Sequence, residues 1–357
     1  MTVLDAHCDS PSQMLRLRDF GKDNARGQVD FPKLKRGGVD ASFFALYIPA
    51  RLGCGDAAFA YMQSLLDETE RQVAANPDLC AFARCSADVA ANKAAGRFSV
   101  LLGLENGSPI GDDLSLVSRL YDKGIRYITL THSADNQICD SCTGEGTWGG
   151  LSPFGRELVR EMNRVGMLID LAHCADSTVR DVLELSAAPV AYTHGCCRAL
   201  SNHRRNLPDE LLRGIAGSGG VVGMSIYPCF LSEEFCRVLA ASGLEEKMWV
   251  EDEFIKDPGD PAKADAWAEL QEELKALPRP GIGRVVEHIM HALEVCGDDH
   301  VGIGTDYDGI EVTAAGLETV AGFAKVFDEI RGRGVNENVI GKVAGGNFLR
   351  LLDAVCA

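Results

Sequence analysis

Positive charge and long apolar runs are both scarce in this sequence. Its 357 residues include 35 Lys and Arg against 52 Asp and Glu, which gives a formal net charge of −17. This balance argues against nucleic acid or an anionic membrane surface as a partner. No apolar run approaches the length of a membrane span, and the N-terminus has no charged region followed by an apolar signal core. We therefore expect a cytoplasmic protein without a membrane anchor.

A complete disulfide framework is also excluded, although cysteine is abundant. The chain has 13 cysteines, an odd number, and without an export signal we expect mostly free thiols. Cys139 and Cys142 form one Cys-x-x-Cys, "CDSC", but no second such pair and no His-x-His lies near it in the sequence. A redox or metal-storage protein built on these cysteines is therefore a minor alternative.

Short apolar runs alternate with longer amphipathic ones along the chain. Eight strands with helices between most of them predict a parallel sheet closed as a (β/α)8 TIM-type barrel. The mostly apolar runs fit strands that are covered on both faces. The predicted strands are 3–7, 41–48, 98–105, 127–132, 167–173, 189–194, 220–227 and 300–306. The predicted helices are 57–75, 113–123, 154–165, 176–186, 208–217, 282–296, 316–332 and 345–354.

We expect residues 1–357 to form this barrel as a single domain. The longest departure from the alternation is residues 232–281, an acidic stretch between the seventh strand and its helix, with a helical middle bounded by proline and glycine. It predicts an excursion over the barrel rim. A lid and an oligomer contact are possible roles, and a solvated helical decoration is the simplest one.

Chemically active residues follow several of the predicted strands. Barrel enzymes place their reactive groups at the C-terminal ends of the strands, and four of the eight histidines of this protein lie at such ends. In the first strand, His7 and Asp9 are two residues apart and can reach one common target. The complete set is His7, Asp9, Glu105, His132, His173, His194 and Asp306.

Such a ring of imidazoles and carboxylates needs a cation, because the groups would otherwise lose solvation and repel one another. Nitrogen and oxygen donors in this mixture suit Zn²⁺, or less selectively Mn²⁺, Co²⁺ or Fe²⁺. Glu105 is the candidate to bridge two ions through its two carboxylate oxygens. None of these strand ends carries a lysine that could form the carboxylated bridge of other metallohydrolase barrels.

Six stretches of the sequence occur in the same order as in a known family. They are "DAHCDSP", "GLENG", "ITLTHSADN", "IDLAHCADST", "APVAYTHGCCRALSNHRRNLPDE" and "HVGIGTDYDG". Together they resemble the membrane (renal-type) dipeptidases, peptidase family M19, a branch of the amidohydrolase superfamily. The resemblance covers nearly the whole chain to about residue 310, and its most specific parts surround His194 and Asp306.

The resemblance implies a zinc-dependent dipeptidase with two metal ions per chain. His7 and Asp9 would hold one zinc ion, His173 and His194 would hold the other, and Glu105 would bridge them. A metal-bridged hydroxide would then attack the peptide bond of a free dipeptide.

The resemblance also implies roles for residues around the metals. His132 would contact the substrate and help to polarise the scissile carbonyl. Arg205 would bind the terminal carboxylate of the dipeptide, with Asn206 beside it as a weaker candidate. Asp306 would manage protons during the reaction, whereas Asp308 would point to the opposite side if the strand continued.

Some implied properties rest on the resemblance alone. They are a homodimer, tolerance of a D-residue at the C-terminal position, and β-lactam cleavage as a side activity. The sequence departs from the family pattern at Ser10-Pro11, where Leu-Pro is usual, so the pocket floor can differ. The loop after His132 and the excursion also diverge, which leaves the side-chain preference open.

Two further alternatives remain at this point. The chain could be another binuclear amidohydrolase that acts on a cyclic amide, a lactone or a phosphoester, and a substrate without a carboxylate would not depend on Arg205. It could also be an inactive barrel that serves as a binding partner, although all the expected metal ligands are present.

Overall fold

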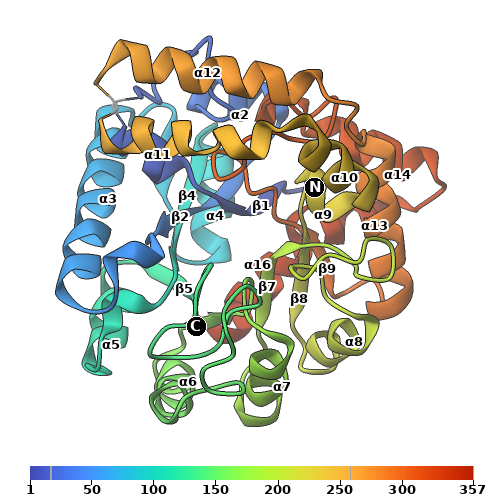
Figure 1. Cartoon of the computed structure of the whole chain (residues 1–357). Coiled ribbons are helices and arrows are strands. Elements are labelled where there is room, and N and C mark those ends of the chain that lie inside the picture. The colour runs from blue at the N-terminus through green and yellow to red at the C-terminus, as the bar shows by residue number, and fades with distance from the viewer. Residues whose placement is uncertain (17, 258, 357) are drawn as a thin grey trace.

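The computed structural model describes residues 1–16, 18–257 and 259–356. Eight parallel strands among these residues pair in the order β1-β2-β4-β5-β6-β7-β8-β9, and helices surround them (Figure 1). The strands are β1 (Leu4–Cys8), β2 (Ala41–Tyr47), β4 (Phe98–Glu105), β5 (Ile125–Thr129), β6 (Leu168–Asp170), β7 (Ala191–Gly195), β8 (Val221–Met224) and β9 (Val301–Ile303). The (β/α)8 barrel predicted from the alternation is confirmed.

The barrel closes between its first and last strands. Beyond the end of β9, the N–H of Asp306 donates to the carbonyl of His7 at 3.0 Å, and the N–H of Asp9 donates to the carbonyl of Tyr307 at 2.8 Å. The buried carboxylate of Asp5 accepts hydrogen bonds from the backbone N–H and the hydroxyl of Thr305, at 2.8 and 2.6 Å. These bonds fix the residues just after β9 against the end of β1, where the candidate donors lie.

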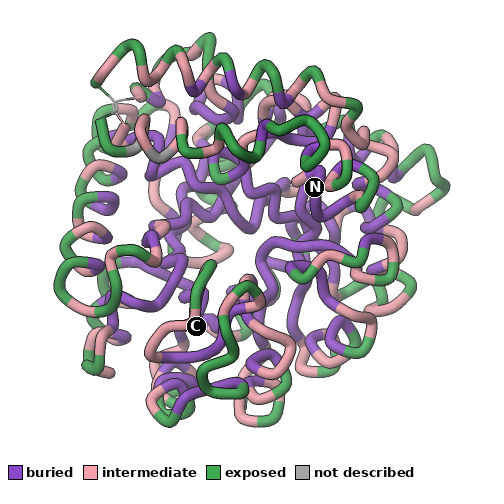
Figure 2. The backbone as a smooth tube through the Cα atoms, in the orientation of Figure 1, coloured by how far each residue is buried: buried purple, intermediate pink, exposed green. Residues whose placement is uncertain are grey.

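The helices cover the outer face of the barrel, and the buried backbone lies toward its centre (Figure 2). The helices around the barrel are α1 (Ser10–Leu15), α2 (Phe31–Gly37), α3 (Asp56–Ala75), α4 (Ser86–Ala94), α5 (Ser115–Asp122), α6 (Pro153–Val165), α7 (Asp176–Leu185), α8 (Asp209–Gly217), α13 (Ile282–Cys296), α14 (Ala324–Gly332), α15 (Glu337–Gly341) and α16 (Asn347–Val355). Seven of them begin and end close to the predicted positions, whereas α1, α2, α4 and α15 were not predicted. None of the helices in the described part of the chain is long and apolar enough to cross a membrane.

Some predicted boundaries were wrong. The helix expected over 316–332 begins at Ala324, because Gly316 has a φ of +93° and Val320–Gly322 forms only a 3-10 turn. A short strand, β3 (Cys80–Phe82), was missed and pairs with β4 outside the barrel path.

Four predicted strands end three residues earlier than expected. The strands predicted to reach His132, His173, Tyr227 and Asp306 end at Thr129, Asp170, Met224 and Ile303. His173 and Asp306 have left-handed φ values of +67° and +66°, which a strand cannot continue through. Their side chains are therefore presented by the turns that follow the strands.

The segment between β8 and α13 contains α9 (Pro228–Leu231), α10 (Glu233–Ser242), α11 (Trp249–Lys256) and α12 (Pro261–Ala276). Helices α11 and α12 lie side by side across one edge of the barrel (Figure 1). The helices of this segment share a small core, in which Phe235 of α10 and Trp267 and Leu270 of α12 are buried. The helical middle predicted for residues 232–281 is thus present.

Candidate metal centre and substrate cavity

His7 and Asp9 project from the end of β1 into the mouth of the barrel. The His7 ring is fully buried and its Nδ1 lies 2.8 Å from the hydroxyl of Tyr127 on β5. Its other nitrogen, Nε2, lies 3.5 Å from Asp9 Oδ2 and 3.5 Å from Glu105 Oε1. The contact with Tyr127 fixes the ring so that Nε2 faces the carboxylates.

Glu105, the last residue of β4, lies at the centre of the cluster. Its Oε1 is 3.1 Å from His173 Nε2 and 3.7 Å from His194 Nε2, in addition to the His7 contact. The Nε2 atoms of His173 and His194 are themselves 2.9 Å apart. One carboxylate therefore faces both histidine groups, as a bridging ligand would.

Buried hydrogen bonds also hold His194 in place. Its Nδ1 lies 3.0 Å from the hydroxyl of Thr193. That hydroxyl donates to the carboxylate of Asp170 at 2.8 Å, and the same carboxylate accepts a hydrogen bond from the Thr129 hydroxyl. This chain orients His194 Nε2 toward Glu105 and His173.

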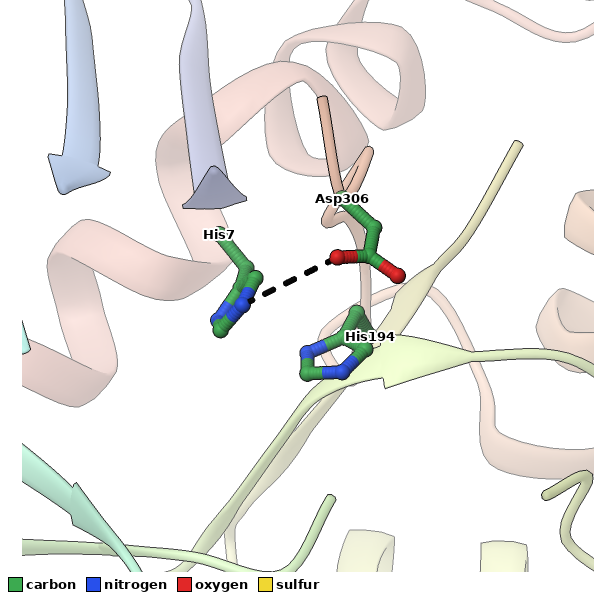
Figure 3. Close-up of side chains that lie close together, drawn as sticks. All are labelled: His7, His194 and Asp306. Carbon is green, nitrogen blue, oxygen red and sulfur yellow. Dashed lines mark ion pairs between the residues drawn. The ribbon is translucent and has the colours of Figure 1, made fainter. Parts of the chain in front are cut away.

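The arrangement of these nitrogen and oxygen atoms suits coordination of a divalent cation better than hydrogen bonding among themselves. Three groups of residues each bring one ligand atom within 4.8 Å of the others: His7, His194 and Asp306; Glu105, His173 and His194; and His7, Asp9 and Glu105. The first group converges from β1, β7 and the turn after β9 (Figure 3), with His7 Nε2 3.9 Å from Asp306 Oδ1. His7 Nε2 and Asp9 Oδ1 are buried without a hydrogen-bond partner. Unpaired buried donors of nitrogen and oxygen are suited to zinc or a similar ion.

Burial dominates the electrostatics of the cluster. It raises the pKa of Asp306 well above its usual value, and the nearby charge of Asp9 raises it further. It raises the pKa of Asp9 as well, with Glu105 adding to the shift. Burial also lowers the pKa of His173 and of His194 well below the usual value, so both rings are neutral, the state that binds metals.

A cavity of about 280 Å³ opens above the donors. His132 lies on its wall, with Nε2 3.9 Å from Glu105 Oε1 and a buried Nδ1 that has no hydrogen-bond partner. Burial lowers the pKa of His132 to about 3, with Arg205 adding to the effect, so this imidazole is neutral. Asp306 lines the same cavity, and so does Asp308, whose Oδ1 pairs with Arg18 at 2.9 Å.

Arg205 lies behind the cavity wall and is only 4% exposed. Its guanidinium donates to the Tyr192 hydroxyl at 2.8 Å and to the His194 carbonyl at 3.2 Å, and its Nε is buried without a partner. Among the described residues, no carboxylate forms an ion pair with it. Phe230, which lines the cavity, lies over this guanidinium at 5.1 Å.

Asn206 is engaged with the backbone. Its Nδ2 donates to the carbonyls of Ser201 and Phe230, at 2.8 and 2.7 Å. Its Oδ1 is buried without a partner. The geometry gives it a role in holding helix α9, which carries Phe230, and it does not line the cavity.

Sequence reasoning missed the residues that support the cluster and those that surround the cavity. Asp170 had a visible signal, since it is a carboxylate inside the apolar stretch "IDLAH". Tyr127, Arg16 and Arg51 had none, because their roles depend on which loops and strands meet in space. The cysteines matched expectation, since all 13 are free thiols, Cys139 and Cys142 included.

Comparisons with known proteins find relatives over nearly the whole chain. The profile of the family described as "Membrane dipeptidase (Peptidase family M19)" matches residues 1–357. Dipeptidase aclJ of Aspergillus oryzae is 32% identical over 341 residues, covering 93% of this chain and 71% of that protein. Dipeptidase verJ of Clonostachys rogersoniana is 31% identical over 337 residues, covering 92% and 76%.

Solved structures share the fold over the same range. The probable dipeptidase PvdM from Pseudomonas aeruginosa is 25% identical with a TM-score of 0.83, covering 100% of this chain and 96% of that chain. A metallo peptidase from Rhodobacter sphaeroides, solved with a phosphinate mimic of the dipeptide L-Ala-D-Ala, is 24% identical with a TM-score of 0.81, covering 99% of each chain.

Proposed function

This chain belongs to the membrane dipeptidase family, peptidase family M19, and we propose that it hydrolyses the peptide bond of free dipeptides with two zinc ions per chain. Membership in this family makes it a metal-dependent dipeptidase. The observation that carries the proposal is the position of Glu105 Oε1, which the Nε2 atoms of His7, His173 and His194 approach within 3.7 Å.

The donors divide into two sets around Glu105. His7 and Asp9 would hold one ion, His173 and His194 would hold the other, and Glu105 would contact both. When bound, two divalent ions supply Lewis acidity and lower the pKa of water so that a nucleophile is available near neutral pH. Mn²⁺, Co²⁺ or Fe²⁺ are possible substitutes for zinc, because the same donors suit them.

Asp306 and His132 provide the proton transfer and the polar contact at the scissile bond. A carboxylate whose pKa is raised by burial is a stronger base, so Asp306 would take the proton of the attacking water and return it to the leaving amine. His132 is neutral and its ring lines the cavity, so it can donate one hydrogen bond to the developing oxyanion.

Arg205 would bind the terminal carboxylate of the dipeptide. A buried guanidinium without an acidic partner among the described residues is costly, and a substrate carboxylate would supply that partner. Phe230 lines the cavity and lies over this guanidinium, so we expect its ring to move when the carboxylate binds. Asn206 would act indirectly, by holding the carbonyl of Phe230. A longer peptide would bury an uncharged amide where this carboxylate belongs, which explains a restriction to dipeptides.

Three finer features complete the proposal. Substrates would include dipeptides with a C-terminal D-residue, and two chains would form a homodimer, both on the family resemblance. The whole chain would act as one barrel domain with residues 232–281 as part of its rim, since Glu251 on α11 lines the cavity.

The test combines metal content with turnover. The purified protein would be analysed for zinc and assayed with L–L, L–D and glycine-ended dipeptides and with their C-terminal amides. We expect about two metal ions per chain. We also expect Arg205→Ala to lower kcat/KM for free dipeptides about 10²-fold, through loss of a charge-assisted contact. Arg204→Ala, the exposed neighbour, is the matched control.

Each part of the proposal has its own contrary result. Dipeptide amides should be poor substrates for the unmodified protein, and Arg205→Ala should no longer distinguish them from free dipeptides. If two metal ions were bound but no dipeptide were cleaved, the substrate would instead be a cyclic amide, a lactone or a phosphoester. Absence of bound metal from protein supplied with zinc would refute the metal centre itself.

A further inference from the structure

Two arginines lie on the side of the cavity opposite Arg205. Arg16 directly follows α1, which begins just after β1, and Arg51 lies in the 3-10 turn η1 (Ala50–Leu52) after β2. Arg205 follows β7, and three strands separate β2 from β7 in either direction around the barrel. The two sides of the cavity therefore carry separate cationic groups, with the donor cluster between them.

Neither of these guanidinium groups forms a hydrogen bond or a close ion pair within the described ranges. Both line the cavity, where the charge of Glu251 acts on Arg16. Arg16 is half-buried, and its guanidinium lies 5.8 Å from the ring centre of Phe254 on α11. A half-buried guanidinium held over an aromatic ring loses part of its solvation, which favours contact with an anion.

The acidic residues on the cavity wall are partly committed elsewhere. Asp308 pairs with Arg18 at 2.9 Å and accepts a hydrogen bond from the Ser10 hydroxyl at 3.0 Å. Glu311 contacts the Tyr227 hydroxyl. Glu251 on α11 influences Arg16 electrostatically, and it keeps the pKa of that arginine from falling further on burial. The Arg16 and Arg51 side of the cavity thus has two guanidinium groups beside the Glu251 carboxylate and can take a further anion.

We propose that Arg16 and Arg51 recognise the acidic side chain of the N-terminal residue of the substrate, so that the preferred dipeptides begin with aspartate or glutamate. The inference rests on the proposed dipeptidase function. With the terminal carboxylate toward Arg205 and the scissile bond over Glu105, the N-terminal residue faces the β1 and β2 side. Its side-chain carboxylate then meets two guanidinium groups that can each donate charge-assisted hydrogen bonds.

Tyr47 and Tyr61 give this side of the cavity its shape. Tyr47 ends β2 and Tyr61 belongs to α3, and both line the cavity. The positive charges of Arg16 and Arg51 both act on the Tyr61 hydroxyl, whose pKa burial raises. Both arginines therefore lie on the same side of the cavity as this phenol.

The experiment compares matched substrates in the zinc-loaded protein. We would measure kcat/KM for L-Asp-L-Ala against L-Asn-L-Ala, and for L-Ala-L-Asp against L-Ala-L-Asn. The unmodified protein should prefer L-Asp-L-Ala over its amide counterpart by about 10- to 100-fold, the range of a charge-assisted contact. No such preference is expected in the second pair.

Variants then assign the preference to the two arginines. Arg51→Gln and Arg16→Gln should each lower the Asp-to-Asn ratio by about tenfold and leave turnover of L-Asn-L-Ala within about twofold. Arg160→Gln, on the exposed face of α6, is the control for loss of a surface charge. Because Arg51 is exposed, its variant should fold normally even if Arg16→Gln does not.

The contrary outcomes separate this inference from the function beneath it. Equal turnover of L-Asp-L-Ala and L-Asn-L-Ala, or an equal loss of both in the variants, would overturn the inference while dipeptidase activity stands. A preference for L-Ala-L-Asp over L-Ala-L-Asn, without one for L-Asp-L-Ala, would also overturn the inference. The acidic residue would then be recognised at the C-terminal position of the dipeptide. Failure to cleave any dipeptide would overturn the proposed function itself.

Discussion

The donor cluster at the strand ends and the cavity rim above it differ in what holds their side chains. In the cluster, His7, Glu105 and His194 belong to barrel strands and are almost fully buried. On the rim, Arg51 is exposed in a short turn, and Arg16 rests against Phe254 of a helix in the excursion.

From this difference we infer that the cluster carries out the reaction and that the rim selects among substrates. A displaced ligand atom in the cluster disturbs several buried contacts at once, whereas a rim residue can change without disturbing the sheet. We therefore expect substitutions in the cluster to lower turnover of every substrate. Substitutions on the rim should instead change the choice among substrates or the stability of the excursion.

The largest effect is expected from Glu105→Gln. The substitution keeps the size of the side chain but removes its charge and turns one oxygen into a donor facing the imidazole nitrogens. Turnover should fall about 10³-fold, and bound metal should fall with it. Metal analysis and kcat/KM provide the measurement, with Glu157→Gln on the exposed face of α6 as control. Normal metal content and turnover would remove Glu105 from the centre of the site.

A smaller effect is expected where the loop after β9 meets the cluster. A Cβ on Gly309 would lie 2.0 Å from Asp9 Oδ2 and 2.6 Å from Asp306 Oδ1. Gly309→Ala should therefore displace both carboxylates while the sheet stays intact, and lower kcat by about 10²-fold. Gly332→Ala is the matched control, since a Cβ there meets nothing within 4 Å. Equal kcat values for the two variants would show that the carboxylate positions are not critical.

The cluster could be predicted from the sequence because its residues are tied to strand ends. His7 and Asp9 follow a short apolar run, and parallel strands bring all such ends to one face of the barrel. The rim could not be predicted in this way. Arg16 and Arg51 are two ordinary arginines in short turns, and only the packing of η1 and α11 around the cavity brings them together.

Backbone conformation was the other limit of the sequence analysis. The apolar runs near His173 and Asp306 gave no sign that each residue adopts a left-handed φ and leaves the strand. Asp308 would point away from the site only if the strand continued to it. It has a positive φ, of +64°, so the strand does not continue, and Asp308 lines the cavity.

Acid should weaken the support of the rim. His288 on α13 accepts a hydrogen bond at Nδ1 from the N–H of Cys197 at 3.1 Å, and its Nε2 contacts the carbonyl of Leu231 in α9 at 3.2 Å. Burial lowers its pKa to about 4 from 6.5. Between these values the unfolded chain binds a proton that the folded chain does not, so stability falls as the pH falls from 6.5 toward 4.

From pH 7 to pH 5, this residue should remove about 2 kcal/mol from the free energy of unfolding, which is about a 30-fold change in the unfolding constant. Urea titrations of the unmodified protein and of His288→Gln at both pH values give the measurement. The variant can keep both hydrogen bonds without titrating, so its loss between the two pH values should be smaller by that amount. Equal losses would show that His288 does not titrate as its burial requires. His300→Gln controls for removal of a histidine elsewhere.

The smallest effect is expected from Tyr127→Phe. This variant tests whether the buried hydroxyl of Tyr127 affects the zinc affinity of the cluster. Tyr127→Phe removes the contact to His7 Nδ1 at 2.8 Å but leaves the ring packed against Phe43, with centroids 5.0 Å apart. His7 keeps its place and loses only its orienting partner, so zinc affinity should fall about tenfold in a chelator competition. Tyr121→Phe removes a similar hydroxyl contact, to the Cys356 carbonyl at 3.0 Å, on the outer layer of the barrel. If both variants bound zinc as tightly as the unmodified protein, the strand ends alone would orient His7. If zinc affinity fell only in Tyr127→Phe, Tyr127 would contribute to metal binding although it does not line the cavity.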